Sequence, residues 1–269
     1  MGKVIFNQNL THRRSTIQFS MMRAIFLLSI RIFVLRYRSD KLSFLWSVLE
    51  PATLSLAYWF LITQVSKGSL GIEPYYLFVA SGILPWLWFS NSIKDSQSMF
   101  RSHGKLMSSL GLPRILWPIP IILSRLADYL FGLSILLLLP SLVLEFRISF
   151  VWIVVAIAAQ FTLTLSLVYI LSPIITLIPD FARLVTVCLR IGFFLTPILY
   201  LSINVPRYFD LIIRLNPLNP IFEMYRHGLF GSQVSNETFG WLTVSIGLLL
   251  GIGLTLNHLV RKTTLKALL

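Results

Sequence analysis

The sequence has little negative charge and almost no cysteine. Of its 269 residues only 10 are Asp or Glu, whereas 23 are Lys or Arg, and charged residues make up 12% of the chain. A soluble domain carries about 25% charged residues, so this composition excludes an ordinary soluble protein. The hydrophobic share of 56% and the mean hydropathy of +0.79 favour a polytopic membrane protein. The single cysteine, Cys188, excludes an internal disulfide, and its apolar surroundings predict a buried thiol.

The usual patterns of catalytic and metal sites are also missing. Gly104-Lys105 is followed by Leu106 where a phosphate-binding loop needs Ser or Thr, so we expect no ATP hydrolysis by this chain. The histidines are isolated, at positions 12, 103, 227 and 258, which gives no metal-ligand spacing. No pair of carboxylates stands out as a glycosidase or glycosyltransferase site. We therefore expect a protein that is not an enzyme and has neither a metal nor a cofactor of its own.

Six apolar runs predict an all-α integral membrane fold with six spans, which places both termini on one side of the membrane. The predicted spans are residues 42–64, 75–93, 115–139, a helix within 148–179, 184–201 and 239–259. The chain then divides into an N-terminal segment, a single transmembrane domain and a tail, with bounds 1–41, 42–260 and 261–269.

The distribution of basic residues supports this topology. Sixteen Lys and Arg residues fall on the side of the two termini, five on the other side, and two, Arg125 and Arg190, within spans. The side with sixteen is expected to be cytoplasmic. The formal net charge of +13 is thereby explained by membrane topology, and no nucleic-acid partner is expected.

The N-terminal segment contains an amphipathic pattern. Apolar residues recur at three- and four-residue steps between Ile17 and Tyr37, and Arg23 and Arg31 interrupt them. Two internal arginines argue against a membrane span. The pattern predicts a helix that lies in the membrane interface.

Two connecting segments have unusual compositions. Residues 101–114 are basic and lie between two apolar runs, with Leu106 and Leu110 at helical spacing, so we expect a cytoplasmic loop on which another protein acts. Residues 202–238 are too apolar for a free loop, and the repeated Asn-Pro steps at Asn216 and Asn219 break them. They predict a re-entrant helical hairpin that enters from the outer face beside a pathway, with an interfacial surface loop as the alternative.

Charges and aromatic residues within the spans suggest further roles. Arg125 and Asp128 lie three residues apart, and we favour a structural ion pair over a proton relay. Lipid-facing packing is favoured for any single aromatic residue in or near the first and fifth spans. Together they can line a conduit for a sliding polymer, and the predicted lining residues are Tyr58, Trp59, Phe60, Phe193, Phe194 and Tyr200.

In this context four stretches resemble the membrane subunit of ABC-2 type exporters. They are residues 35–51, 77–93, 112–120 and 195–226, in the family's order and spacing. The resemblance is to the branch that exports polysaccharides and polyol phosphates, such as O-antigen, capsule, teichoic acid and galactan. One step departs from it: many relatives have Arg-Asp after the fourth span, where this chain has Pro179-Asp180.

The resemblance implies a bacterial exporter in the cytoplasmic membrane, built from two copies of this chain and two of a separate ATPase that binds ATP and Mg. A lipid-linked polysaccharide would pass through a channel at the homodimer centre, among membrane lipids. Its phosphate groups would meet Arg36, Tyr37 and Arg38 at the cytoplasmic entrance. Residues 101–113 would be the coupling helix on the ATPase, and the predicted coupling residues are Arg101, Lys105, Leu106, Leu110, Pro113 and Arg114.

Two other functions remain open from the sequence. An ABC-2 exporter of a drug or a small lipid would have few channel aromatics and a side opening to the bilayer. An ATP-independent secondary transporter would use Arg125 and Asp128 and would depend on the proton gradient.

Overall fold

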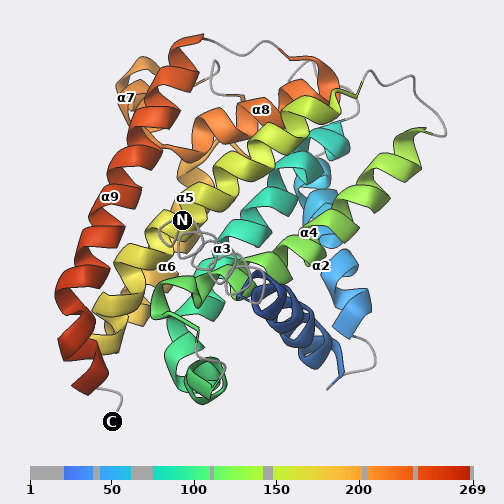
Figure 1. Cartoon of the computed structure of the whole chain (residues 1–269). Helices are drawn as coiled ribbons and strands as arrows, with labels where there is room; N and C mark the ends of the chain where they lie inside the picture. The colour runs from blue at the N-terminus through green and yellow to red at the C-terminus, as the bar shows by residue number, and fades with distance from the viewer. Residues whose placement is uncertain are drawn as a thin grey trace, which may run out of the picture.

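The structure, a computed structural model, describes residues 21–38, 43–61, 75–109, 112–141, 148–201, 205–232 and 236–266. Within these ranges helices and short connections occur without any strand, so the all-α prediction is confirmed. Residues 21–38 are helical. The elements that follow are α2 (Ser43–Phe60), α3 (Tyr75–Ser109), η2 (Arg114–Leu116), α4 (Pro118–Ser141), α5 (Phe150–Leu177), α6 (Phe181–Leu195), α7 (Arg207–Leu215), α8 (Leu218–Phe230) and α9 (Asn236–Lys266) (Figure 1).

Three stretches of the described residues are long and apolar enough to cross a membrane. They are Arg114–Ile135, Phe150–Leu177 and Phe239–Leu259. They coincide with the third, fourth and sixth predicted spans. The other three spans stay a prediction.

The predicted fifth span is a shorter helix than the apolar run suggested. α6 ends at Leu195, whereas the sequence predicted a span to residue 201. Thr196 precedes Pro197 and is extended, with ψ 137°, because a residue before proline disfavours the helical conformation. The 15 residues of α6 extend over about 22 Å, which is less than the hydrocarbon core of about 30 Å. The chain after α6 must therefore complete this side of the bundle.

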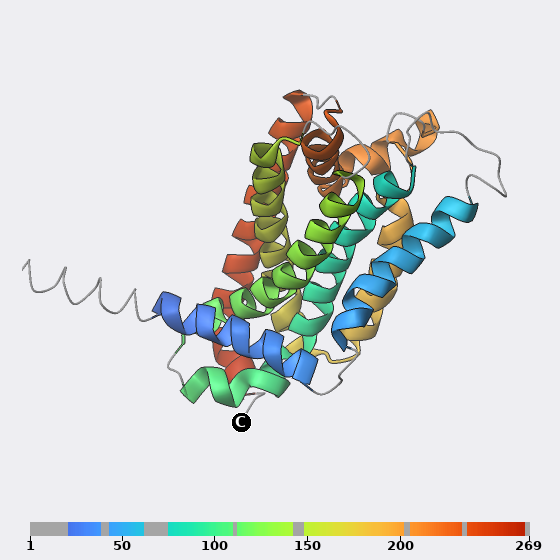
Figure 2. The same ribbon diagram turned by 90° about the vertical axis from the view of Figure 1, so that its right-hand side faces the viewer.

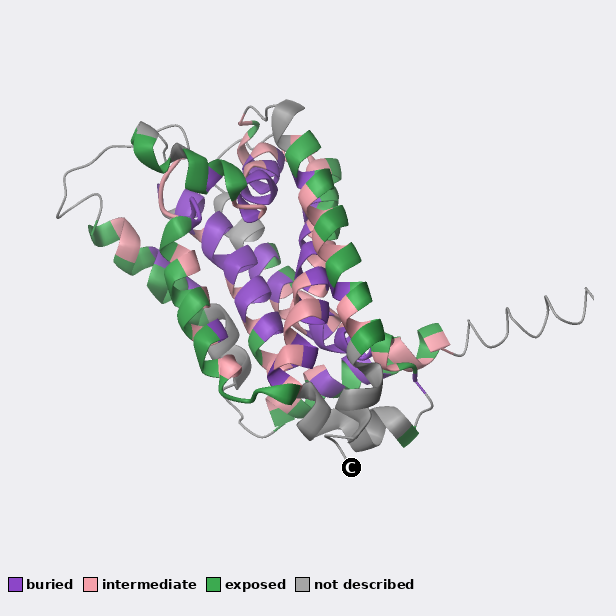
Figure 3. Ribbon diagram, turned by 90° about the vertical axis from the view of Figure 1, so that its left-hand side faces the viewer, coloured by how far each residue is buried: buried purple, intermediate pink, exposed green. Residues whose placement is uncertain are grey.

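α5 lies at the centre of the fold. It packs against α3, α4, α6, α8 and α9. Figure 3 shows the buried positions gathered in the middle of the bundle and the exposed ones along the outer helices. α9 lies close to α5 at Gly253, where a Cβ atom would lie 2.8 Å from the Cβ of Tyr169. A glycine at this position permits the two helices to touch backbone to side chain.

The N-terminal helix, residues 21–38, lies across one end of the bundle, beside the C-terminal part of α3 (Figure 2). It buries a narrow strip that includes Leu28, Ser29 and Ile32. Its opposite face is apolar and exposed, with Phe26 and Ile30 among its residues. The helix therefore packs one strip on the bundle and leaves exposed apolar residues together with Arg23 and Arg31. That it lies in the membrane interface stays a prediction.

α3 runs without a break from Tyr75 to Ser109. The predicted second span and the first nine residues of the 101–114 segment therefore belong to one helix. Pro85 lies within it. The side chains at 101–108, and Leu110 altogether, lie outside the described residues.

The segment predicted as a hairpin contains two helices, α7 and α8, with a break at Asn216-Pro217. Asn216 stabilises the break, because its Oδ1 accepts the backbone N–H of Leu218 at 3.0 Å and its Nδ2 donates to Oγ1 of Thr196 at 2.9 Å. α8 is almost wholly buried, whereas α7 exposes apolar side chains such as Tyr208, 77% exposed. Whether this pair enters the membrane stays a prediction.

Candidate functional site

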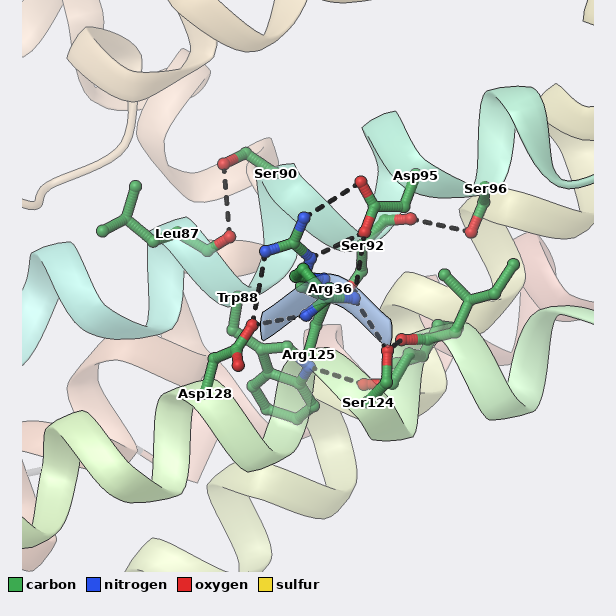
Figure 4. A network of polar contacts seen from close by, with 12 residues as sticks. Arg36, Leu87, Trp88, Ser90, Ser92, Asp95, Ser96, Ser124, Arg125 and Asp128 are labelled. Carbon is green, nitrogen blue, oxygen red and sulfur yellow. Dashed lines mark hydrogen bonds and ion pairs between the residues drawn. The ribbon is translucent and has the colours of Figure 1, made fainter. Parts of the chain in front are cut away.

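Four charged side chains meet at the end of the bundle covered by the N-terminal helix. Arg36 comes from that helix, Asp95 from α3, and Arg125 and Asp128 from α4 (Figure 4). Each arginine contacts both carboxylates. Because the group has two arginines and two aspartates, its formal charge is zero. We call these four residues the charge cluster.

Arg125 is held mainly by Asp95. Its Nε donates to Oδ2 of Asp95 at 2.7 Å and its Nη2 to Oδ1 at 3.1 Å, which makes a two-pronged contact. The pair predicted from the sequence, Arg125 and Asp128, is also present, but its nitrogen–oxygen distance is 3.3 Å. Sequence analysis did not name Asp95. A parallel fork is the strongest geometry for an arginine and a carboxylate, so Asp95 is the principal partner of Arg125.

Arg36 and Tyr37 bind the same carboxylate, that of Asp128. Nη1 of Arg36 donates to Oδ2 at 2.7 Å, and the hydroxyl of Tyr37 donates to Oδ1 at 2.6 Å. Nη2 of Arg36 donates to Oγ of Ser124 at 2.9 Å. Burial and the nearby Arg125 charge lower the pKa of Arg36, while the two carboxylates oppose this effect. These contacts attach the N-terminal helix to α4.

The predicted entrance residues therefore point in different directions. Arg36 and Tyr37 face the bundle, whereas Arg38 is exposed. The resemblance placed all three near phosphate groups. In this structure the guanidinium of Arg36 is bound to carboxylates.

Small polar residues allow the helices to approach each other around the charge cluster. Ser92 and Ser96 of α3 and Ser124 of α4 are buried. Ser96 donates to the carbonyl of Ser92 at 2.7 Å, and Ser124 to that of Ile121 at 2.8 Å. Trp88 of α3 donates from Nε1 to the carbonyl of Ile122 at 3.2 Å. Small residues at a helix contact shorten the distance between backbones, which brings Asp95 within reach of α4.

The predicted channel aromatics fall into separate environments. Tyr58, Phe193 and Phe194 form one chain of contacts, with ring centroids 5.9 Å apart for the first pair and 5.2 Å for the second. Trp86, which sequence analysis did not include, joins Phe193 at 5.8 Å. Trp59 is half-buried and Phe60 is exposed on α2. Tyr200 is tied to the backbone, because its hydroxyl donates to the carbonyl of Phe194 at 3.1 Å.

Two apolar grooves lie beside α6. One, of about 410 Å³, is lined by residues of α3, α5 and α6 that include Trp86, Phe89 and Cys188. The other, of about 390 Å³, lies between the end of α6 and α7 and is lined by Phe194 and Tyr200 among others. Cys188 is exposed, so the expectation of a buried thiol is wrong. An apolar run does not show which helix face another helix covers.

The end of the predicted coupling segment and the residues directly after it contact the bundle. Pro113 is exposed, and the guanidinium of Arg114 lies 5.6 Å from the ring centroid of Trp117. Trp117 donates from Nε1 to the carbonyl of Leu112 at 2.9 Å. The hydroxyl of Tyr169, on α5, donates to the carbonyl of Ile115 at 2.6 Å. A movement of residues 112–117 would therefore reach the central helix directly.

A further arginine, Arg226 of α8, is buried at the opposite end of the bundle and is only 4% exposed. Its Nη2 donates to the carbonyls of Pro197 at 2.5 Å and Ile198 at 3.1 Å, and its guanidinium lies 4.0 Å from the ring centroid of Phe78. The sequence analysis placed Arg226 among the five basic residues on the side of the membrane opposite the termini. The only local indication of burial was the apolar composition around it.

The described residues contain no group of three or more His, Cys, Asp or Glu side chains that could hold a metal ion. The chemistry available at the charge cluster is that of guanidinium groups and carboxylates. It can bind anions or hold helices together, and it offers no activated nucleophile.

The sequence is similar to known transport proteins. Residues 23–230 match the family described as ABC-2 type transporter. The O-antigen export system permease protein RfbA of Myxococcus xanthus is 30% identical over 194 residues, which cover 71% of this chain and 74% of the relative. RfbA of Klebsiella pneumoniae is 30% identical over 228 residues, 82% and 83% of the two chains. The polysialic acid transport protein KpsM of Escherichia coli is 25% identical over 247 residues, 87% and 91% of the two.

Proposed function

The chain belongs to the ABC-2 type transporter family, and we propose that it is the membrane-spanning subunit of an ATP-driven exporter of a lipid-linked polysaccharide. The resemblance to the polysaccharide export branch that the sequence suggested is confirmed. The observation that carries the proposal is the similarity to O-antigen and polysialic acid transport proteins over most of both lengths. Three apolar helices long enough to span a bilayer support a membrane subunit.

The energy source in this proposal is a separate ATPase. The sequence has no phosphate-binding loop, so two copies of a partner that binds ATP and Mg would act on two copies of this chain. Residues 101–113 are the proposed contact with that partner. The hydrogen bond from Tyr169 to Ile115 supports this role, because it connects the end of the segment to α5.

The proposed pathway lies at the centre of a homodimer. Within the single chain, α2 and α6 expose apolar faces that include Phe60, Ile191 and Phe194, and a second copy would cover part of them. Tyr58, Phe193 and Phe194 lie on these helices and would line the conduit. α7 and α8 would form the re-entrant hairpin on the outer side, because α6 alone is too short to span.

The proposed topology has both termini in the cytoplasm and the chain in the bacterial inner membrane. The N-terminal helix would then lie at the cytoplasmic interface, at the inner end of the bundle, and α8, which carries Arg226, would lie at the outer end (Figure 1). The excess of basic residues on the side of the termini supports this orientation.

The test is transport by inverted membrane vesicles that contain this chain and its candidate ATPase subunit. We expect ATP-dependent uptake of a lipid-linked polysaccharide. Leu106→Asp should lower uptake by about tenfold or more, because loss of one buried leucine contact costs about 1.5–3 kcal/mol. The matched control is Leu265→Asp, the same change in the cytoplasmic tail, which should retain uptake. Normal export by Leu106→Asp contradicts the coupling role.

The same assay separates the alternatives. Uptake that persists without any ATPase and stops when the proton gradient is dissipated would indicate a secondary transporter. ATP-dependent uptake of a small lipid, with none of the polysaccharide, would indicate the drug or lipid branch of the family.

A further inference from the structure

The chain at the end of the proposed coupling segment is a turn that bonds to itself. Two backbone hydrogen bonds, at 2.9 and 3.1 Å, each join an N–H to the carbonyl three residues earlier, and the second of these donors is Trp117. Nε1 of Trp117 also donates to the carbonyl of Leu112 at 2.9 Å, and both side chains are buried. Residues 112–117 are therefore expected to move as one unit, which we call the coupling turn.

The sequence leaves one carbonyl of the coupling turn without the donor that this series of bonds would supply. The next N–H in the series would bond the carbonyl of Ile115, but it would belong to Pro118, which has no N–H. The hydroxyl of Tyr169 donates to that carbonyl at 2.6 Å. Tyr169 lies on α5 and is only 5% exposed. It thus supplies, from another helix, the bond that Pro118 cannot make.

Tyr169 is bonded to α9 as well. Its carbonyl accepts Nδ2 of Asn257 at 2.5 Å, and the same Nδ2 donates to the carbonyl of Gly253 at 2.9 Å. The absence of a side chain at Gly253 lets α9 touch Tyr169 directly. One residue therefore bonds the coupling turn through its side chain and α9 through its backbone.

These contacts lie near the end of α5 that leads to α6. Tyr169 is about two helical turns before Leu177, the last residue of α5. A short turn, residues 178–180, then leads into α6, which carries Phe193 and Phe194 of the proposed conduit. A displacement of Tyr169 would therefore reach both α9 and the start of α6.

We propose that Tyr169 is a positioning residue for transport, and that its hydrogen bond to Ile115 makes α5 and α9 follow the coupling turn. This inference rests on the proposed function, because an ATPase partner must move the turn. Without the hydroxyl, the turn would move while α5 and α9 stayed behind. ATP would then be hydrolysed without export.

The first test compares uptake of a lipid-linked polysaccharide with ATP hydrolysis in the same inverted vesicles, which contain this chain and its candidate ATPase subunit. Tyr169→Phe removes the hydroxyl and keeps the ring. We expect ATP hydrolysis to continue and uptake per ATP to fall about fivefold, the factor that one hydrogen bond of this kind contributes.

The matched control is Tyr75→Phe. The hydroxyl of Tyr75 donates to the carbonyl of Leu199 at 2.7 Å, and this tyrosine is also buried, so the same kind of bond is lost at the beginning of α3. Uptake per ATP should be retained. An unchanged ratio in Tyr169→Phe, or an equal loss in the two variants, overturns the proposal.

A double variant separates coupling from stability. Pro118→Ala combined with Tyr169→Phe restores an N–H for the carbonyl of Ile115 but no bond to α5. We expect the unfolding free energy lost in Tyr169→Phe to return, while uptake per ATP stays low. Recovery of both quantities would show that the hydroxyl only satisfies a carbonyl, and it would overturn the proposal.

The last test needs no polysaccharide. Amide hydrogen exchange of the complex in detergent is measured with and without a non-hydrolysable ATP analogue, in peptides that cover residues 112–117 and 253–259. In the unchanged chain and in Tyr75→Phe we expect the analogue to change exchange in both peptides. In Tyr169→Phe only the first peptide should respond.

The outcomes of this test are distinct. A response of residues 253–259 that survives Tyr169→Phe, or that is missing in the unchanged chain, overturns the role of Tyr169. No response of residues 112–117 contradicts the coupling segment of the proposed function, and the role of Tyr169 fails with it. A response of both peptides in a complex that moves no polysaccharide contradicts the proposed function alone.

Discussion

Arginine is placed inside both ends of this bundle, but its partners differ. At the end covered by the N-terminal helix, Arg36 and Arg125 are bound to Asp95 and Asp128, and all four side chains are partly exposed. At the opposite end, Arg226 is bound to backbone carbonyls and an aromatic ring. The nearby carboxylate of Glu223 adds a favourable charge to the surroundings of Arg226.

The difference indicates which end is held by contacts that solvent and salt can weaken. Carboxylates on separate helices can be exchanged for another anion, and solvent and salt weaken their attraction to arginine. Backbone carbonyls in a turn cannot be exchanged for another anion, and a buried guanidinium that loses such acceptors is costly to leave unpaired. Arg226 therefore fixes the junction of α6 with α7 and α8, whereas the charge cluster joins its helices through contacts that salt can weaken.

The largest effect is expected for Arg226→Met. The carbonyls of Pro197 and Ile198 would lose their donor, and buried acceptors without a donor cost about 1–3 kcal/mol each, so we expect a loss of about 3 kcal/mol of unfolding free energy. Arg226→Lys should be intermediate, because an ammonium group has neither the fork nor the planar face. The measurement is denaturant unfolding in detergent. Arg190→Met, the same change at an exposed position of α6, is the control and should be nearly neutral.

An unchanged unfolding free energy in Arg226→Met would contradict the distinction between the two ends of the bundle. It would mean that apolar packing at this site replaces the guanidinium at no cost, as happens for some buried ion pairs.

The next effect is expected for Asp95→Asn. It leaves two arginines with one carboxylate, and because Asp95 is 32% exposed the loss should be about 2 kcal/mol, below that of a fully buried pair. Lys94→Gln removes an exposed neighbouring charge and serves as the control. The loss caused by Asp95→Asn should shrink as salt is raised, whereas that of Arg226→Met should not. Equal salt dependence of the two variants would contradict the distinction between the ends.

Local features of the fold were predictable from the sequence. The apolar runs predicted the helices, and the Asn-Pro step predicted the break at Asn216-Pro217. The three-residue spacing predicted that Arg125 and Asp128 meet. Each of these depends on residues close in the chain, where helix geometry alone determines the contact.

The partners of the buried arginines were not predictable, because they come from distant parts of the chain. Asp95 lies 30 residues from Arg125 and 59 from Arg36, and no periodicity connects them. The carbonyls that hold Arg226 belong to a turn whose position depends on Pro197 ending α6. The exposure of Cys188 depends on which face of α6 another helix covers, and an apolar run carries no such information.

The smallest effect is expected for Gly82→Ala, which tests whether packing also fixes the end that Arg226 holds. A Cβ atom at Gly82 would lie 3.0 Å from both the carbonyl oxygen and Cγ2 of Ile198, so the segment that Arg226 binds would have to move. We expect a loss of about 1 kcal/mol, at the low end of overpacking. Gly251→Ala in α9, with nothing within 4 Å of its Cβ, should instead stabilise the chain by about 0.5–1 kcal/mol. If both variants are stabilised, the turn at Ile198 yields easily, and packing at Gly82 does not help to fix the end of the bundle that Arg226 holds.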